Sequence, residues 1–384
     1  MRRTRRTALV LALVLCLSVL VSAIPRTAAR AERAASHAGL SILGFTLYPD
    51  FQYRYYYNQL SLTEKRVYNT LVNELPKFPK TIQISDSVNE DSLLKIYDAV
   101  RYDNPEFFFL GLKCSYKRNR LVRTVTPSYV LSKKTYESQL KAVSQAADRL
   151  LKNLPQNASD YEKELYVYNK LGTYTKYSNS GTASHGPYGA LVRKQSNCEG
   201  YARTLQLLLN RAGVVNHVVP GKAIKRDGSR PNHMWNVVTV GGQDYCADLT
   251  WDDYDRNFAG GDTKALPSHY YFNRSAEVFR KDHLPTDSAA VRTCTSDNAN
   301  YFRRNSLYYT SYNAETKRAI QSKLKAALKN GDDSFEVMFA ASAWSAAKKD
   351  LATNGRLLAW ARSSGARGGR CIATEKYKVV RIVL

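Results

Sequence analysis

The sequence predicts an α+β fold organised around residues 197–253. An amphipathic helix is predicted from Glu199, with apolar residues three and four apart at Leu205, Leu208, Leu209 and Ala212. Gly213 stands where a helix C-cap belongs, before a β-prone run at 214–219. The runs 234–240 and 243–250 flank Gly241-Gly242, which is typical of a hairpin. The helix is expected to pack on the antiparallel sheet to which this hairpin belongs, with N-terminal and C-terminal α+β segments on either side.

Residues 1–31 have the composition of a secretory signal peptide. MRRTRR is basic, residues 8–24 are an apolar run of 17, and small-x-Ala sites follow at 21–23 and 29–31. The run is at the short end for a membrane span. We therefore expect a cleaved signal rather than a retained anchor, no stable membrane span afterwards, and a secreted protein, with association with the cell wall left open.

Residues 32–135 are predicted to form an N-terminal module of helices and aromatic residues. One helix opens at Leu62 and ends before Pro76, and a second covers 88–102 and stops at Asp103-Asn104-Pro105. FFFLGLKCSY then predicts a strand. We interpret the Tyr and Phe residues as core packing; a carbohydrate-stacking surface is the alternative.

Residues 136–285 are predicted to be the catalytic core. Helices are expected at 133–154 and 160–171, separated by Pro155-Gln156-Asn157. The loop 178–189 is rich in Ser, Gly and Asn and precedes the central helix, so we expect it to form one wall of a substrate cleft. His185 in this loop is interpreted as an ordinary loop histidine, and His217 as a core residue.

Residues 300–384 are predicted to be a small C-terminal α+β module. The pattern indicates a helix at 314–329, a strand at 334–339, a helix at 342–351 and terminal strands at 371–384. The stretch 285–300 before it resembles a linker. No catalytic signal is visible in this module, and its basic surface suggests wall attachment or partner binding.

Cys198 is the candidate nucleophile. It lies at the start of the central helix, where the helix dipole and free backbone N–H groups favour a thiolate and can hold an oxyanion. A buried structural cysteine is the alternative when this residue is considered by itself.

His233 and Asp248 complete a possible triad. With a two-residue turn at Gly241-Gly242, Trp235 lies opposite Asp248 and His233 lies diagonal to it on the same face; a four-residue turn sets His233 directly opposite Asp248. A one-residue slip would put the two side chains on opposite faces. Cys198, His233 and Asp248 have the residue types of a thiol nucleophile, its base and an orienting carboxylate.

The motifs CEGYA, VVPGKA, H-x-W-N and D-L-T-W-D-D, in this order, resemble the bacterial branch of the transglutaminase-like superfamily. The likeness covers about 110 residues, from roughly Asp160 to Tyr271. It implies a papain-like core in which Cys198, His233 and Asp248 are the catalytic residues. Such proteins often carry a His-Asp pair where this chain has Tyr168-Asn169, a site that we interpret as structural.

The charge points to anionic partners. The chain carries 57 Lys and Arg against 33 Asp and Glu, a net charge of +24; residues 1–31 hold six of the arginines and no acid, which leaves +18. An exported basic protein is expected to be drawn to anionic cell-wall polymers or a lipid surface, although generic solubilising charge explains the excess equally well. Export and the lack of a base-reading motif argue against nucleic-acid binding.

The cysteines allow two interpretations. Apart from Cys198, the residues after the signal are Cys114, Cys246, Cys294 and Cys371, which allow three pairings into two disulfides; four free thiols are equally compatible with a chain of this length. No C-x-x-C pair, close His/Cys cluster or acidic calcium loop occurs in the sequence, so we expect neither a metal nor another cofactor.

The function predicted from these residues is attack on carboxamide or peptide bonds through a thioester on Cys198, at the bacterial cell surface. The expected substrate is a protein or peptide with Gln or other amide groups. The acyl acceptor, an amine or water, stays open. The alternatives are a cysteine protease or amidase of cell-wall peptides, and a non-catalytic wall-binding protein with a vestigial core.

Overall fold

The computed structural model describes residues 41–42, 45–46, 54–117, 121–155, 157–181, 185–253 and 266–384. The predicted signal peptide, 1–31, lies outside the described residues. The chain divides into two compact units, Met1–Gln52 and Tyr53–Leu384. In the first, the short strands β1 (Ser41–Ile42) and β2 (Phe45–Thr46) pair antiparallel.

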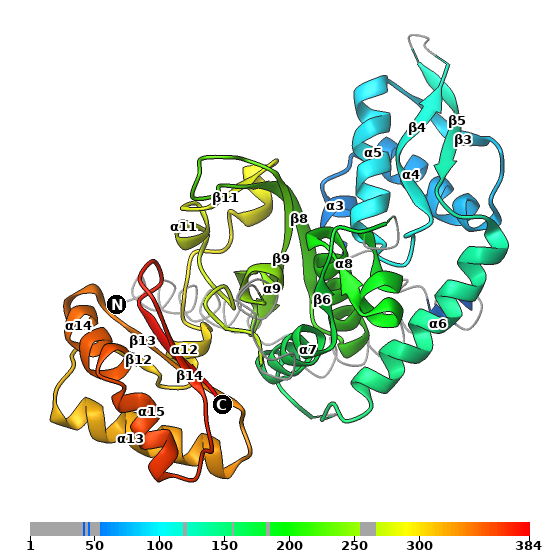
Figure 1. The fold of residues 1–384 in the computed structure, drawn as a ribbon. Coiled ribbons are helices and arrows are strands. Elements are labelled where there is room, and N and C mark those ends of the chain that lie inside the picture. Colours follow the sequence, from blue (N-terminus) through cyan, green and yellow to red (C-terminus); the bar gives the residue numbers. More distant parts are fainter. Residues whose placement is uncertain are drawn as a thin grey trace, which may run out of the picture. The chain divides into compact units, whose positions relative to one another are not determined.

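The N-terminal module contains helices packed on a small sheet (Figure 1). Its antiparallel sheet has the order β3-β5-β4. The Ser61 hydroxyl caps α4 in a capping box with Glu64, which explains why the helix begins at Leu62. The elements are α3 (Tyr55–Asn58), α4 (Leu62–Glu74), β3 (Ile82–Val88), α5 (Glu90–Asp103), β4 (Leu110–Tyr116) and β5 (Val122–Tyr129).

The central part contains three main helices and an antiparallel sheet of order β10-β9-β8-β11. The helices are α6 (Lys133–Leu151), α7 (Asp160–Tyr174) and α8 (Cys198–Ala212). The strands are β8 (Asn216–Ala223), β9 (Asn232–Val240), β10 (Gln243–Ala247) and β11 (His283–Pro285). The shorter elements are β6 (Lys176–Tyr177), β7 (Gln195–Ser196), α9 (Leu249–Asp252) and α11 (Ala276–Phe279).

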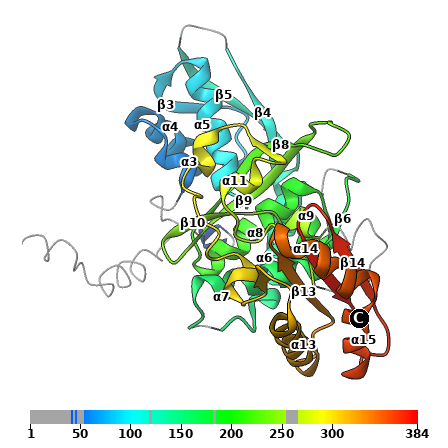
Figure 2. The same cartoon turned by 90° about the vertical axis from the view of Figure 1, so that its left-hand side faces the viewer.

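Both faces of this sheet are covered. Val218 and Met234 on one face pack with Ala202 of α8, and the Asn236 amide donates to the Ala202 carbonyl at 3.0 Å. Trp235 and Val237 on the other face belong to a second hydrophobic cluster, shared with residues after 269. Figure 2 shows α8 and the sheet between the N-terminal and C-terminal elements.

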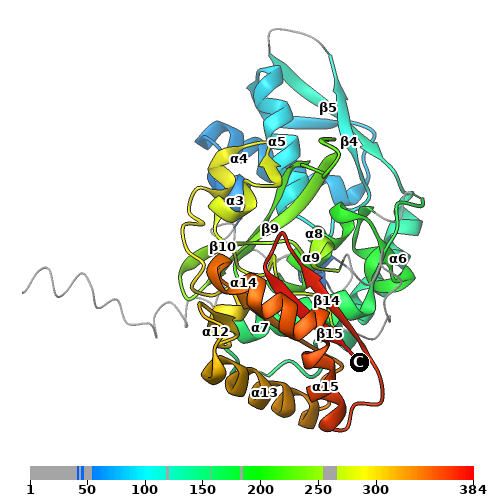
Figure 3. The ribbon, with the colours of Figure 1, turned by 60° about the vertical axis from the view of Figure 1, so that its left-hand side comes forward.

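The C-terminal elements form a four-stranded sheet with helices beside it (Figure 3). The sheet order is β12-β13-β15-β14, in which β12 and β13 are parallel and the other pairs antiparallel. The strands are β12 (Tyr308–Tyr309), β13 (Ser334–Phe339), β14 (Arg370–Thr374) and β15 (Val379–Val383). The helices are α12 (Tyr301–Arg304), α13 (Ala314–Lys329), α14 (Ala341–Ala347) and α15 (Arg356–Ser363).

The stretch 285–300 differs from the expected linker. Ala290, Val291 and Cys294 are buried in the cluster that also contains Trp235 and the apolar face of the C-terminal sheet. This cluster joins the predicted catalytic core and C-terminal module within one compact unit. The boundaries of the predicted domains stay predictions. Among the helices in the described ranges, none is long and apolar enough to cross a bilayer.

Candidate active site

Cys198 is the first residue of α8. The Asn197 side chain caps the helix by accepting a hydrogen bond from the Gly200 N–H at 3.1 Å, and Gly213 ends the helix in the left-handed conformation with φ of 75°. This cap explains why the helix begins at Cys198, since it satisfies one of the N–H groups that the first turn leaves without an intrahelical partner. The thiol is partly exposed and lies at the positive end of a helix of 15 residues.

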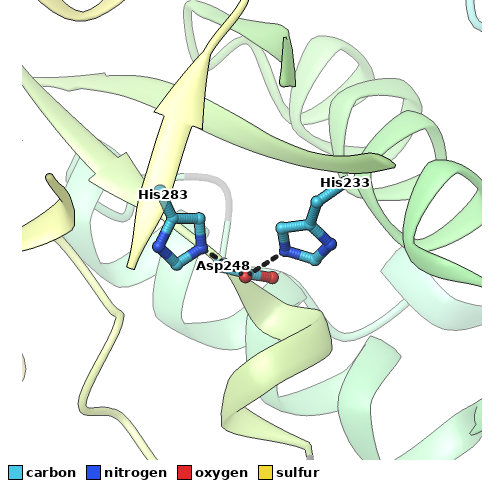
Figure 4. Close-up of side chains that lie close together, drawn as sticks. All are labelled: His233, Asp248 and His283. Carbon is cyan, nitrogen blue, oxygen red and sulfur yellow. Dashed lines mark hydrogen bonds and ion pairs between the residues drawn. The ribbon is translucent and has the colours of Figure 1, made fainter. Parts of the chain in front are cut away.

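The hairpin adopts the two-residue turn. Val240 pairs with Gln243, and Gly241 and Gly242 both have positive φ, as a type I′ turn requires. Ala247 pairs with Asn236, so the next position along β10 places Asp248 opposite Trp235. The expectation that His233 lies diagonal to Asp248 on the same face is met, because His233 Nε2 is 2.7 Å from Asp248 Oδ2 (Figure 4).

The predicted strand 243–250 is wrong after Ala247. Leu249–Asp252 is a helical turn, and the Asp248 Oδ1 atom caps it by accepting from the N–H groups of Thr250 at 2.9 Å and Trp251 at 3.3 Å. The Asp248 carboxylate therefore has two roles: Oδ2 holds the imidazole of His233 and Oδ1 holds the turn that follows the strand. These contacts fix the orientation of the carboxylate.

His233 links the other two side chains. Because Nε2 contacts Asp248, Nδ1 is left for Cys198, with which His233 makes a side-chain hydrogen bond. Burial works against the imidazolium, but the negative charge of Asp248 and the hydrogen bonds with Asp248 and Cys198 raise the pKa of His233 above its usual value. Burial likewise opposes ionisation of Asp248, yet the charge and hydrogen bonds of His233 and His283 hold the pKa of Asp248 well below its usual range.

The structure thus brings Cys198, His233 and Asp248 together, with the polarity that a thiol nucleophile, base and orienting carboxylate require. The catalytic roles of the three residues stay predictions. Sequence reasoning did not include His283, whose Nε2 lies 3.0 Å from the same Asp248 Oδ2 atom. The Asp282-His283 pair is visible in the sequence, but its pairing with the site depends on β11 joining the sheet beside β8.

A possible metal site has to be considered at the same position. Among the described residues, one group of side chains could each offer a ligand atom to a metal ion, namely His233, Asp248 and His283. Their nitrogen–oxygen separations are 2.7 Å and 3.0 Å. Ligands on a tetrahedral zinc ion with bonds of about 2.0–2.1 Å lie about 3.3 Å apart. The observed spacing is that of hydrogen bonds, and we treat the group as a hydrogen-bonded cluster.

The remaining histidines near the core have structural surroundings. His217 is buried, contacts the Ala290 carbonyl at 2.9 Å, and desolvation lowers the pKa of His217 to about 4. His185 is exposed, and its hydrogen bond with Glu199 at 3.1 Å raises the pKa of His185. Both fit the interpretation as core and loop residues.

The Tyr168-Asn169 site is structural in its contacts. The Tyr168 hydroxyl donates to Asp252 Oδ2 at 2.6 Å, and Asn169 Oδ1 lies 2.7 Å from His269 Nε2. Asp252 also accepts from the backbone N–H of Tyr271 at 3.0 Å. These contacts join α7 to the segment that follows the hairpin.

The five cysteines in the described ranges are free thiols. This agrees with the second of the two interpretations of the sequence. Cys246 and Cys294 are buried and share a side-chain hydrogen bond. Burial raises the pKa of Cys114 and of Cys371 to about 11, so neither thiol competes with Cys198 for reagents near neutral pH.

Part of the chain is similar to known proteins. Residues 145–255 match the model of the transglutaminase-like superfamily. The chain is 26% identical over 164 residues to the human kyphoscoliosis peptidase, covering 39% of this chain and 24% of that protein. It therefore spans about a quarter of the length of this curated relative. A solved TGase structure aligns with 14% identity and a TM-score of 0.26, covering 44% of this chain and 50% of the other.

The match includes all three side chains of the site, because Cys198, His233 and Asp248 lie within 145–255. The order of motifs, the helix-initial cysteine and the hairpin that carries His233 beside Asp248 agree with it. Residues 145–255 are therefore a transglutaminase-like core within a chain of mixed α+β fold.

Proposed function

We propose that this protein is a cysteine enzyme that attacks carboxamide or peptide bonds through a thioester on Cys198. The observation that carries the proposal is the hydrogen-bonded series Cys198–His233–Asp248, with the thiol at the N-terminus of α8. The helix dipole and the imidazolium both favour the thiolate, which is the reactive form of a cysteine.

In the first half-reaction, His233 Nδ1 takes the proton of the Cys198 thiol, and the sulfur attacks the carbonyl carbon. The backbone N–H groups at the start of α8 are placed to stabilise the oxyanion. His233 then gives its proton to the leaving nitrogen, the C–N bond breaks, and ammonia or an amine departs. Asp248 keeps the Nε2 proton of His233 in place throughout, which fixes the imidazole orientation.

In the second half-reaction, an acyl acceptor attacks the thioester. His233 takes a proton from the acceptor and returns it to the sulfur as the C–S bond breaks. A primary amine as acceptor gives a crosslinked product, and water gives deamidation or peptide hydrolysis. Both outcomes use the same three side chains.

Hydrolysis is the second candidate function, because the human relative is named a peptidase. The cysteine protease or amidase alternative therefore differs from acyl transfer to an amine in the acceptor alone. A wall-binding protein with a vestigial core is disfavoured by the hydrogen bonds that join all three side chains.

The test is an incubation of the protein with a glutamine-rich acceptor protein and a fluorescent primary amine, run beside Cys198→Ala. Gel fluorescence that is present with the wild type and absent with the variant supports amine transfer. A mass gain of about one dalton per modified amide without label, from –NH₂ replaced by –OH, supports deamidation, and acceptor fragments support proteolysis. If the wild type and Cys198→Ala behave alike with protein and cell-wall peptide substrates, the proposed function is wrong.

We also propose that the protein acts outside the cell, on the basis of the signal-like residues 1–31 and the basic charge. Anionic cell-wall polymers are the proposed surface partner. Expression of the full chain in a bacterium, followed by intact mass of the protein recovered from the medium and the wall fraction, tests both points. A retained N-terminus in the cytoplasmic fraction would contradict them.

A further inference from the structure

A second histidine holds the far side of the Asp248 carboxylate. His283 begins β11, and its side chain is 0% exposed. Its Nε2 atom lies 3.0 Å from Asp248 Oδ2, and its Nδ1 atom lies 2.6 Å from Asp282 Oδ1 (Figure 4 shows the first contact). The ring centroid lies 4.6 Å from that of Trp251 and 4.9 Å from that of Trp235, which encloses the imidazole in aromatic surroundings.

The two contacts of His283 determine its protons. An ionised carboxylate only accepts hydrogen bonds, so a ring nitrogen that contacts one must carry a proton. Burial opposes ionisation of Asp282 and of Asp248, but the hydrogen bonds and charges of their partners outweigh it, and both carboxyl pKa values are lowered. Each ring nitrogen of His283 therefore faces a carboxylate oxygen to which it can donate a hydrogen bond.

The network continues to the C-terminal sheet. Asp282 Oδ2 accepts from the Lys376 ammonium at 2.7 Å and from the Tyr271 hydroxyl at 2.6 Å. Lys376 lies in the turn between β14 and β15, so the C-terminal sheet contributes a residue to the network around the site. Along these contacts, groups that can be anionic alternate with groups that can be cationic. The order is Cys198, His233, Asp248, His283, Asp282 and Lys376.

We propose that His283, held in its charged form by Asp282, is a positioning residue that orients the Asp248 carboxylate towards His233 and shares its negative charge. This rests on the proposed function and deepens it. With two cations on one oxygen, Asp248 stays ionised despite burial and binds the His233 proton less tightly than a carboxylate with a single partner. A general acid that must give its proton to a leaving nitrogen benefits from this balance.

The charged and titratable groups that face this network come from several elements. His283 faces Asp248 from the start of α9, Asp282 from its own segment, and His233 from β9 at 5.3 Å between ring centroids. Tyr271 lies 5.3 Å from His283, ring to ring, and Tyr377, which neighbours Lys376 in the same turn, contacts the Tyr271 hydroxyl. His233 faces Cys198 and Asp248.

The first test is His283→Gln, measured by kcat and KM and by the pH dependence of Cys198 alkylation with chloroacetate. This anionic reagent is attracted by the imidazolium, so alkylation slows when His233 loses its proton. The upper pH limit of the thiolate–imidazolium pair, where His233 loses its proton, should rise by about one pH unit, because Asp248 loses its competing cation. We expect kcat to fall about 10- to 100-fold, as expected for the loss of a hydrogen bond to a charged group, with KM within about threefold.

Asp282→Asn separates charge from orientation and serves if His283→Gln does not fold. The Asn amide can donate to Nδ1 of a neutral His283 ring, which still donates from Nε2 to Asp248. The upper pH limit should therefore rise as in His283→Gln, whereas kcat should fall less, about 10-fold or under. Lys376→Met should have a smaller effect than either, because this side chain is 50% exposed and solvent screens its charge.

His269→Gln is the matched control. His269 is buried and has the Glu336 carboxylate on Nδ1, but its Nε2 atom contacts Asn169 instead of a member of the triad. This change should lower thermal stability and leave the upper pH limit of Cys198 alkylation unchanged. A merely structural role for His283 would give the same pattern in His283→Gln.

The proposal is overturned if folded His283→Gln or Asp282→Asn keeps the wild-type upper pH limit, or if His269→Gln shifts the limit equally. Alkylation needs no amide substrate, so this outcome is independent of the proposed function. If the limit shifts as expected while the wild type transfers and hydrolyses no amide, the proposed function fails and the positioning role stands. If the wild type is active and the upper pH limit does not shift in the variants, the proposed function stands and the positioning role of His283 fails.

Discussion

Replacing Asp248 by Asn tests the hydrogen-bond geometry of the site. In the native site all four contacts of the carboxylate are donors: the ring nitrogens of His233 and His283 donate to Oδ2, and the N–H groups of Thr250 and Trp251 donate to Oδ1. An amide has one accepting oxygen and one donating NH₂ group. Neither orientation of the substituted amide can therefore satisfy all four donors.

Each orientation has its own consequence. With the amide nitrogen towards the helical turn, α9 loses its cap. With the nitrogen towards the rings, His233 must present a lone pair on Nε2 and therefore carry its proton on Nδ1, which faces Cys198. A ring already protonated on Nδ1 cannot take the thiol proton, so the second orientation removes the general base.

The size of the effect follows from these contacts. Loss of a hydrogen bond to a charged group costs about 1.5–3 kcal/mol, which corresponds to about 10- to 150-fold in rate. The equivalent change in serine triads, which sets the wrong histidine tautomer, costs about 10⁴-fold. We therefore expect Cys198 alkylation at pH 7 to slow by about 10²- to 10⁴-fold in Asp248→Asn.

The assay is the rate of Cys198 carboxymethylation by chloroacetate, an anionic reagent attracted by the imidazolium, from pH 4 to 11. The product is read by intact mass with Cys198→Ala as the background. In the wild type, the raised pKa of His233 keeps the imidazolium, and the thiolate paired with it, above the usual histidine range. The pair is lost only as pH rises through that raised pKa. In Asp248→Asn the upper limit should fall towards about 6.5, the ordinary histidine value. A rate within threefold of wild type and an unchanged limit would refute the reasoning.

Three further predictions concern the scaffold. Gly221→Ala should lower the free energy of unfolding by about 1–3 kcal/mol and slow alkylation of Cys198. The added Cβ would lie against the carbonyl of Leu284, the residue after His283, and 2.7 Å from the Trp235 ring. An unchanged melting temperature and alkylation rate would contradict this. Asn197→Ala should lower the free energy of unfolding by about 1 kcal/mol and slow alkylation of Cys198. Asn313→Ala removes the equivalent cap of α13, so it should lower the stability by the same amount and leave the alkylation rate unchanged. Equal effects of the two variants on alkylation would argue against a capping role of Asn197 at the nucleophile. Burial raises the pKa of Glu164 to about 8, so the wild type loses stability as pH rises from about 4.3 to 8. In urea unfolding, Glu164→Gln should be as stable as the wild type near pH 4 and more stable by about 2–4 kcal/mol at pH 8. Equal stability of the two proteins at pH 8 would contradict a buried neutral acid at this position.

The elements with strong local signals could be predicted from the sequence. The predicted helix 314–329 and strand 334–339 coincide with α13 and β13, and Gly213 and the Gly241-Gly242 turn bound the central elements as expected. These positions combine apolar periodicity with a residue that tolerates positive φ, so local sequence is sufficient.

The elements that were missed depend on tertiary contacts. The sequence of β3, IQISDSV, becomes polar in its second half and does not predict a strand. The strand forms because it pairs with β5. The turn at Leu249–Asp252 replaced a predicted strand end because Asp248 caps it. His283 reaches Asp248 across 35 residues, through a strand of three residues, and no local pattern marks that contact.

The most direct test of the central claim is detection of the acyl-enzyme. The protein would be mixed with an activated acyl substrate, quenched in acid within seconds, and measured by intact mass and peptide mapping, beside Cys198→Ala and His233→Ala. We predict an adduct on Cys198 that hydroxylamine removes, that forms far more slowly in His233→Ala, and that is absent in Cys198→Ala. An adduct on another residue, or equal acylation of the wild type and His233→Ala, would contradict the triad.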